Sequence, residues 1–378
     1  MRSRSRRKDA IVNAATGVTL RALPRIPNGV KRVLLGCRSI TLDGNTLDTT
    51  LQLLLAAQRA AGSDSLASSD DALAARSQLE ILTARLKQDI KVAAVTDLLV
   101  PGPGGAIPAR YYRPDANAAR SGSPTTALLV FYHGGGFTLG SIDTHDDQCR
   151  LICRDGGLPV LSIEYRLAPE NKFPAAVVDA FAAYRWAVDN ACELGADPKQ
   201  VAVGGDSAGG TLAAVVSQLA RDEGVQLPAL QLLIYPQTSL VNASRSKTLF
   251  ANGFLLTNRD MAWFRHNYLN GAEVELSDPR VSPLLAPDLS GLPPALVLTA
   301  GFDPLRDEGN QYAEAMRAAG VIVDHRVSGS LIHGFISFFP LGGDSATATT
   351  EMISALRAHI CRSATAAAEA PPAAEGRR

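Results

Sequence analysis

The sequence lacks the features expected of a protein that binds a polyanion, crosses a membrane or binds the phosphates of a nucleotide. Its 378 residues carry 37 Lys and Arg against 37 Asp and Glu, so the formal net charge is zero. This balance gives no support for binding nucleic acid with the protein as a whole. No apolar run reaches the roughly 20 residues of a transmembrane helix. The sequence also has no Gly-Lys-Ser/Thr, which argues against a phosphate-binding loop.

Cysteine is scarce, and its spacing does not suggest a metal site. The five cysteines are an odd number, and none shows the paired C-x-x-C spacing of zinc ligands. Cys149 and Cys153 are four residues apart and would share one face of a helix. We interpret them as buried free thiols of a protein in a reducing, cytoplasmic compartment.

The N-terminus is strongly basic and is followed by a modestly apolar run, residues 11–20. This order superficially resembles a secretory signal, but Asn13 and Gly17 interrupt the run and no clear cleavage site follows. Ser5-Arg6-Arg7 resembles a twin-arginine signal, except that Asp9 stands where an apolar residue is expected. Three interpretations stay open: an export signal, a segment on anionic lipid, and a helix that packs on a cap above the rest of the chain.

The most informative motif is Gly-Gly-Asp-Ser-Ala-Gly-Gly at 204–210, which contains G-x-S-x-G with Ser207 at its centre. An apolar strand-like segment precedes it and a helix-like run, Thr211–Glu223, follows. This context is typical of a tight strand-to-helix turn that strains and exposes a nucleophilic serine. Gly205 and Gly209 would flank the serine because the turn leaves no room for a Cβ. The motif indicates acyl transfer.

A glycine run that could stabilise an oxyanion comes earlier in the chain. Residues 127–132 form an apolar, β-prone segment, and His133-Gly134-Gly135-Gly136-Phe137 follows at once. Backbone N–H groups of such a turn can point into one concavity, together with the N–H of Ala208 just after the serine.

An acid should come next, and three carboxylates compete. Residues 293–301 read as a buried strand, and Asp303 lies just past its carboxyl end, where open α/β sheets place their sites. Asp307 and Glu308 fall in the first turn of the following helix, where acidic side chains complement the helix dipole. We favour Asp303.

A histidine should complete the order Ser, Asp, His. Three histidines follow Asp303 in the sequence. His325 lies inside a strand-like segment, 321–327, and His359 lies on a C-terminal helix. His333 lies in the loop directly after that last strand and can reach Ser207 from there. We favour His333 as general base and acid, with Asp303 fixing its tautomer.

With these residues in place, residues 90–362 resemble the bacterial hormone-sensitive-lipase family of serine esterases. The chain looks most like actinobacterial lipase and esterase members with a long N-terminal extension. The resemblance rests on four motifs: 133–137, 205–210, 303–307 and 333–335. The block Tyr165 to Glu170 is also typical of that family, and we expect its Arg166 and Glu170 to brace loops by ion pairing.

The resemblance implies an α/β-hydrolase that cleaves carboxylic esters of short- to medium-chain acids through a covalent acyl-enzyme, without a cofactor. It also implies that Gly134 and Gly135, with Ala208, supply the oxyanion hole. The expected substrate is a small-molecule ester, with no nucleic-acid partner and no metal. The alternatives are an amidase or deacetylase on the same triad, a lipase on longer-chain glycerides, or a binding protein built on the fold.

The alternation of strand-like and helix-like runs predicts an α/β fold with a mostly parallel, eight-stranded sheet and helices on both faces. Residues 1–90 read as a helical segment and 91–362 as the catalytic domain. The insert 238–292 is too long and apolar for a surface loop, so we expect it to form a helical cap over Ser207 with the N-terminal helices. The tail 363–378 is expected to be disordered. An exposed edge strand could support a homodimer, and the basic N-terminus could contact a membrane.

Overall fold

The computed structural model describes residues 22–60, 62, 65–67, 69–115 and 127–369. Eight strands form the central sheet: β3 (Ala94–Gly102), β4 (Gly105–Arg113), β5 (Leu128–Tyr132), β6 (Val160–Ile163), β7 (Val201–Asp206), β8 (Gln231–Ile234), β9 (Ala295–Phe302) and β10 (Val323–Ile332). Their order across the sheet is β10-β9-β8-β7-β5-β6-β4-β3. Only β4 runs against its neighbours, so the predicted mostly parallel, eight-stranded sheet is confirmed.

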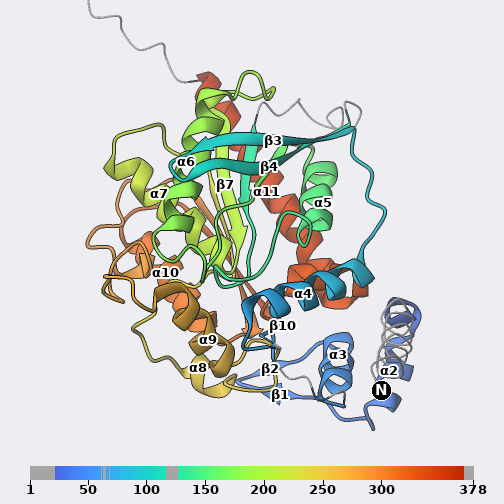
Figure 1. Cartoon of the computed structure of the whole chain (residues 1–378). Coiled ribbons are helices and arrows are strands. Elements are labelled where there is room, and N and C mark those ends of the chain that lie inside the picture. Colours follow the sequence, from blue (N-terminus) through green and yellow to red (C-terminus); the bar gives the residue numbers. More distant parts are fainter. Residues whose placement is uncertain (1–21, 61, 63–64, 68, 116–126, 370–378) are drawn as a thin grey trace, which may run out of the picture.

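Helices cover both faces of the sheet (Figure 1). On one face lie α5 (Asp146–Gly156) and α11 (Gly343–Glu369), and on the other α6 (Ala175–Asp189), α7 (Ala208–Asp222) and α10 (Arg306–Ala318). The remaining helices are α2 (Asn28–Leu34), α3 (Thr49–Ala60), α4 (Ala72–Leu86), α8 (Arg245–Leu249) and α9 (Asn258–Leu269). The described residues also include short 3₁₀ turns: η1 (Leu23–Arg25), η3 (Pro198–Gln200), η4 (Pro283–Leu285) and η5 (Phe335–Leu341).

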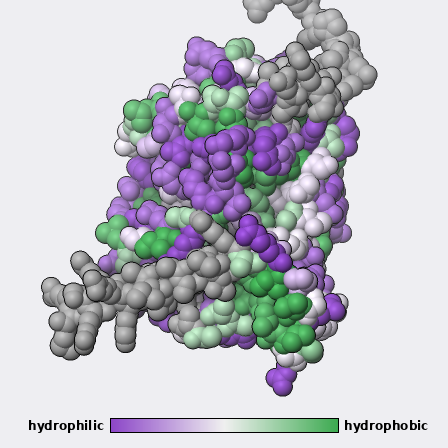
Figure 2. Space-filling model, turned by 90° about the vertical axis from the view of Figure 1, so that its right-hand side faces the viewer, coloured by the Kyte–Doolittle hydropathy of each residue, from purple (hydrophilic) through white to green (hydrophobic). Residues whose placement is uncertain are grey.

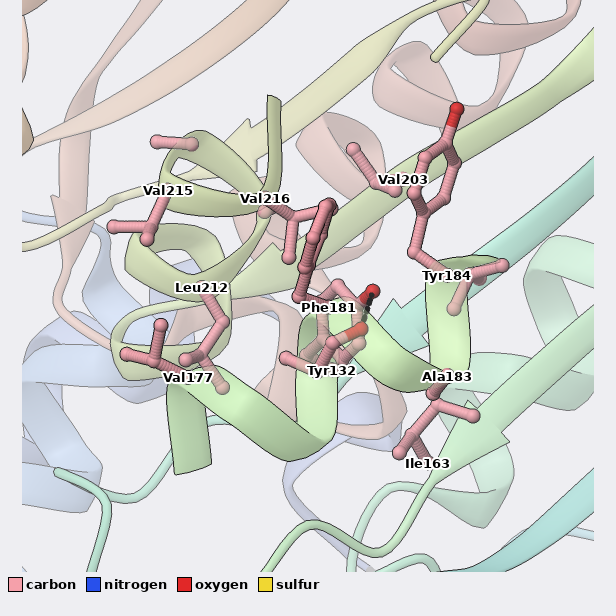
Figure 3. Close-up of a cluster of buried hydrophobic side chains, with 14 of the residues drawn as sticks. Tyr132, Ile163, Val177, Phe181, Ala183, Tyr184, Val203, Leu212, Val215 and Val216 are labelled. Carbon is pink, nitrogen blue, oxygen red and sulfur yellow. Dashed lines mark hydrogen bonds between the residues drawn. The ribbon is translucent and has the colours of Figure 1, made fainter. Parts of the chain in front are cut away.

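The apolar run of β5 explains why the strand lies at the centre of the sheet. All five of its side chains are fully buried, as expected for a parallel strand covered on both faces. Successive side chains point to opposite faces, so Leu129 and Phe131 pack toward α5 and α11. Tyr132 packs on the other face against α6 and α7, in the core cluster of Figure 3. This central strand holds the glycine run that follows it.

Two local features differ from the sequence-based expectation. The N-terminal segment contains a short hairpin of β1 (Thr41–Leu42) and β2 (Asn45–Thr46), although it was expected to be helical. Asp43 and Gly44 form its turn with φ of 53° and 77°, and an Asp-Gly pair favours such a turn. Strand β10 continues past the predicted loop start at 329 through a register shift and ends at Ile332.

The C-terminal helix also differs from the prediction. Helix α11 ends at Glu369, so the backbone of residues 363–369 is helical where a disordered tail was expected. Residues 370–378 and the basic segment 1–21 lie outside the described residues, and the interpretations of that segment stay predictions. Among the helices that the structure describes, none is long and apolar enough to cross a membrane.

Candidate active site

Ser207 lies in a strained turn between β7 and α7. Its φ of 54° and ψ of −118° are a conformation that residues with a side chain rarely adopt. A Cβ on Gly209 would overlap the carbonyl of Tyr132, and one on Gly205 would overlap the same carbonyl and the backbone of Gly209. The predicted strained turn, and the need for glycine on both sides of the serine, are confirmed.

A continuous chain of hydrogen bonds joins Ser207 to His333 and Asp303. The Nε2 of His333 lies 2.9 Å from the Ser207 hydroxyl, and its Nδ1 lies 2.8 Å from Oδ2 of Asp303. The other carboxylate oxygen of Asp303 accepts a 2.8 Å hydrogen bond from the Leu305 amide. Asp303 is fully buried and His333 is 4% exposed. Since the carboxylate faces Nδ1, that nitrogen carries the proton and Nε2 can accept one from the serine.

The competing histidines occupy other places. His325 lies on β10 with its Nε2 3.2 Å from the hydroxyl of Thr299. His359 lies on α11 and contacts the carboxylate of Asp324 at 3.1 Å. Neither contacts Ser207.

The competing acids hold the inserted segment to the sheet instead. Asp307 accepts a 2.8 Å hydrogen bond from the amide of Ser246, at the start of α8. Glu308 is fully buried, accepts the Thr238 amide at 2.9 Å and pairs with Lys247. Burial raises the pKa of Glu308 more than the pairing with Lys247 lowers it. These contacts are more specific than the helix-dipole role expected from the sequence.

The first glycine of the run is held by hydrogen bonds and does not present its amide to the site. The N–H of Gly134 donates to Oδ1 of Asp206 at 2.8 Å. This contradicts the expectation that Gly134 is an oxyanion donor, because its single N–H is already used. Among the described residues, nothing accepts a hydrogen bond from the amides of Gly135, Gly136 or Ala208. The sequence-based expectation named Gly134 and not Gly136, because the direction of an N–H depends on backbone angles that the letters G-G-G do not encode.

The residues behind this loop carry shifted pKa values. Burial alone would raise the pKa of Asp206, but His145 and the Gly134 amide outweigh it and lower the pKa. Burial alone would lower the pKa of His145, but Asp206 outweighs it and raises the pKa. Burial, helped by the charge of His145, lowers the pKa of His133 to about 3. The buried contact of Asp206 with His145, 3.2 Å long, therefore lies beside a His133 whose pKa is far below neutrality.

A cavity of about 850 Å³ opens above Ser207. Its wall is largely apolar and includes residues of α4 (Leu79, Leu82, Leu86), α9 (Met261, Phe264, Tyr268) and η5 (Phe338, Phe339), and of the loop 237–243. The volume lies within the usual range of small-molecule sites. In the part of the chain that is described, no group of three or more His, Cys, Asp or Glu side chains is placed to hold a metal ion.

The block Tyr165 to Glu170 braces the loops around this cavity, as predicted. Arg166 forms a bidentate pair with the buried carboxylate of Asp179, with a shortest contact of 2.7 Å. Glu170 pairs with Arg76 of α4 at 2.7 Å. Arg76 also donates to the carbonyls of Thr138 and Ala168, both at 2.7 Å. One guanidinium thus joins α4 to the loop that follows the glycine run.

The sheet order, the strained serine after a central strand and the histidine after the last strand define an α/β hydrolase. Comparison with known proteins agrees. Residues 129–337 match a family described as alpha/beta hydrolase fold. The chain is 55% identical over 357 residues to carboxylic ester hydrolase LipN of Mycobacterium tuberculosis, covering 93% of both chains.

Two further similarities lie within the same group. Carboxylesterase NlhH of Mycobacterium tuberculosis is 43% identical over 255 residues, which cover 66% of this chain and 78% of the relative. A solved structure of the ester-hydrolase EH1AB1 from the Lake Arreo metagenome is 42% identical with a TM-score of 0.76, covering 82% of this chain and 97% of that one. The chain belongs to the α/β-hydrolase fold family, among its hormone-sensitive-lipase-like esterases, which confirms the resemblance seen in the motifs.

Proposed function

We propose that this carboxylic ester hydrolase uses Ser207 as nucleophile, His333 as general base and acid, and Asp303 as the group that orients His333. The single observation that carries the proposal is the chain of 2.9 Å and 2.8 Å hydrogen bonds from the Ser207 hydroxyl to the buried carboxylate of Asp303. This geometry permits proton transfer from serine to Nε2 without rearrangement.

In the proposed reaction the Ser207 oxygen attacks the ester carbonyl and its proton moves to Nε2 of His333. The carbonyl oxygen becomes an oxyanion, which the free amides of Gly135, Gly136 and Ala208 stabilise. The imidazolium then gives its proton to the leaving alcohol, and an acyl-enzyme remains. Water then attacks the carbonyl of the acyl-enzyme and gives a proton to His333. His333 passes this proton to the Ser207 oxygen as the bond to the acyl group breaks, which releases the acid and the free serine.

We further propose that α4 and the insert 238–292 form a cap over the site. The cavity wall supports this, since α4 and α9 supply its apolar side chains above Ser207. An apolar cavity of about 850 Å³ suits esters of short- to medium-chain acids, because the acyl chain is buried while the ester carbonyl reaches the polar loop.

The test is hydrolysis of p-nitrophenyl esters from acetate to palmitate by the wild type and by Ser207→Ala. We expect the wild type to peak at a short or medium chain and Ser207→Ala to be inactive on all of them. A Ser207→Ala protein with wild-type activity would refute the proposed nucleophile. Highest activity on palmitate would favour the lipase alternative. Cleavage of a matched anilide at a rate similar to that of the ester would favour the amidase alternative.

A second proposal concerns location: a cytoplasmic enzyme that touches anionic membranes peripherally through its basic N-terminal region. The described part of that region supports it. Val30, Val33 and Leu34 lie on one face of α2 and are 49%, 68% and 64% exposed. Arg25, Arg32 and Arg38 are exposed around them. Figure 2 looks onto the side of the molecule where α2 lies and shows hydrophobic surface low on that side.

Sedimentation with phosphatidylglycerol vesicles tests the membrane proposal. We expect Val33→Glu/Leu34→Glu to lose binding, because charge opposes burial of the apolar face. Leu99→Glu, at a 69% exposed position on β3, is the matched control. Equal sedimentation of all three proteins, or no sedimentation of the wild type, would refute the proposal.

A homodimer joined through an edge strand, β3 or β10, is a further proposal. A measurement of the mass of the protein in solution tests it.

A further inference from the structure

Asp206 is a buried carboxylate next to the nucleophile for which the proposed reaction has no use. It is the last residue of β7 and is 5% exposed. Its Oδ1 accepts the 2.8 Å hydrogen bond from the Gly134 amide and lies 3.2 Å from Nε2 of His145. A carboxylate in such a place is costly to bury unless it is paired, so its contacts identify what it does.

The contacts of Asp206 fix the peptide that leads into the glycine run. Asp206 holds the N–H of Gly134, while Nδ1 of His133 lies 2.8 Å from the Gly134 carbonyl. In a planar trans peptide the carbonyl and the following N–H point in opposite directions. Since His133 holds the carbonyl of Gly134 away from the cavity, the N–H of Gly135 points the other way. A Cβ on Gly134 would overlap the Asp206 carboxylate, so no other residue fits.

His145 keeps this carboxylate ionised. Its Nδ1 lies 2.9 Å from the hydroxyl of Thr144, which already donates to the carbonyl of Ser141. The Thr144 oxygen can therefore accept a hydrogen bond from Nδ1–H, while Nε2–H donates to Asp206, which is the arrangement of a charged imidazolium. A charged acceptor makes the hydrogen bond from the Gly134 amide about twice as strong as a neutral one.

The same carboxylate also borders the histidine side of the site. Its second oxygen, Oδ2, lies 3.5 Å from the hydroxyl of Tyr235. The ring of Tyr235 packs on the ring of His333 with centroids 4.7 Å apart. Asp206 thus lies between the loop that offers the amides and the ring that supports the general base.

We propose that Asp206, paired with His145, is a positioning residue that holds the amides of Gly135 and Gly136 toward the developing oxyanion. The inference rests on the proposed role of Ser207 and of these amides. It concerns transition-state binding and not the capture of substrate, so its loss lowers kcat and leaves KM nearly unchanged.

The experiment compares Asp206→Ala and Asp206→Asn with the wild type on a p-nitrophenyl ester. Titration of the serine with a fluorophosphonate first corrects for any protein that is not folded. We expect Asp206→Ala to lose about 100-fold in kcat with KM within about threefold, the effect of losing an oxyanion donor. Asp206→Asn should lose about tenfold, because its amide oxygen still accepts a hydrogen bond but lacks the charge. Binding of a trifluoromethyl ketone, which forms an oxyanion on the enzyme, should weaken in parallel with kcat/KM.

Asp179→Asn is the matched control, because Asp179 is a fully buried carboxylate whose pairing with Arg166 lies outside the cavity. It should lower stability and leave kcat within about threefold. If Asp206→Ala does not fold, Asp206→Asn carries the test. Unchanged kcat in the folded Asp206 variants, or equal loss of kcat in Asp179→Asn, would overturn the inference. Retained activity in Ser207→Ala would instead overturn the proposed nucleophile.

Discussion

The ring of Phe264, on α9, lies directly against the backbone of Gly136, so that a Cβ at position 136 would overlap it. The inserted segment therefore touches the glycine run itself and does not simply cover it. Gly136 also has a φ of 59°, which disfavours a side chain for a second reason. This contact makes the cavity roof and the candidate oxyanion loop one packed unit.

The contact between Phe264 and Gly136 predicts that their substitutions depend on each other. Gly136→Ala should lower kcat by about 100-fold, because the new methyl group and the ring move the loop. Adding Phe264→Ala should restore part of that loss, since the overlap is gone while the backbone strain remains. Kinetics of the two single variants and the double variant measure the coupling. Losses that simply multiply would show that Phe264 does not press on the loop.

The two rival acids can be separated by matched amides. Asp303→Asn should lower kcat by about 10⁴-fold, because the asparagine favours the wrong tautomer of His333. Asp307→Asn should stay within about threefold of the wild type, since Asp307 contacts Ser246 and Arg306. Steady-state kinetics of both variants decide the assignment. The reverse pattern would move the acid to Asp307.

The arginine that joins α4 to the loops should control substrate binding. Arg76→Ala removes the pair with Glu170 and two hydrogen bonds to backbone carbonyls, so α4 should pack less firmly over the cavity. We expect KM to rise more than kcat falls, and the melting temperature to drop. Lys91→Ala, which removes an exposed pair with Asp89, is the control and should change neither. A change in kcat alone would argue against a cap role for α4.

His133 should make the protein less stable in acid. Its pKa in the folded protein is about 3, well below the ordinary 6.5, so the unfolded chain binds the proton first as the pH falls. The free energy of unfolding should therefore decrease from pH 6.5 toward pH 4, by up to about 1.4 kcal/mol per pH unit. The raised pKa of His145 acts in the opposite direction, because the folded protein binds that proton first, and this effect is complete once the pH has fallen well below 6.5.

Chemical denaturation of the wild type and of His133→Gln at several pH values measures this effect. For each protein, the slope of the free energy of unfolding against pH is taken from pH 6.5 to pH 4. The difference between the two slopes is the contribution of His133, because the other titrating groups are common to both proteins. A slope that does not flatten in His133→Gln would contradict the shifted pKa.

The buried thiols should resist modification in the native protein. Burial raises the pKa of Cys153 to about 12 and raises that of Cys149 still further, and thiolates are the reactive form. Cys37 and Cys192 are exposed and should react. Counting thiols with a disulfide reagent before and after denaturation checks this. Reaction of all five cysteines in the native state would contradict it.

The sequence predicted the parts of the site that depend on chain order and on strand ends. Ser207, Asp303 and His333 were chosen because each follows an apolar strand, and parallel strands bring their carboxyl ends to one edge. The structure brings the three together within hydrogen-bonding distance. Strands β5 to β9 were visible for a similar reason, since buried parallel strands are continuous apolar runs.

The parts that the sequence missed depend on backbone direction and on contacts distant in the chain. Three consecutive glycines look alike as letters, yet Gly134 donates to Asp206, whereas no acceptor among the described residues takes the amides of the next two. The role of Arg76 was equally hidden, because Thr138, Ala168 and Glu170 lie far from it in sequence. The Asp-Gly turn of the N-terminal hairpin, in contrast, was a readable signal that helical periodicity obscured.

The cavity is assembled from segments that leave the ribosome at very different times. Helix α4 is made early, Ser207 follows more than a hundred residues later, and His333 lies another 126 residues beyond the serine. Long-range contacts of this kind form slowly, because distant segments must first be brought together. The nascent chain therefore contains the proposed nucleophile long before the proposed base. On the proposed mechanism, hydrolysis must therefore wait until the segment that carries His333 has been synthesised and packed beside Ser207.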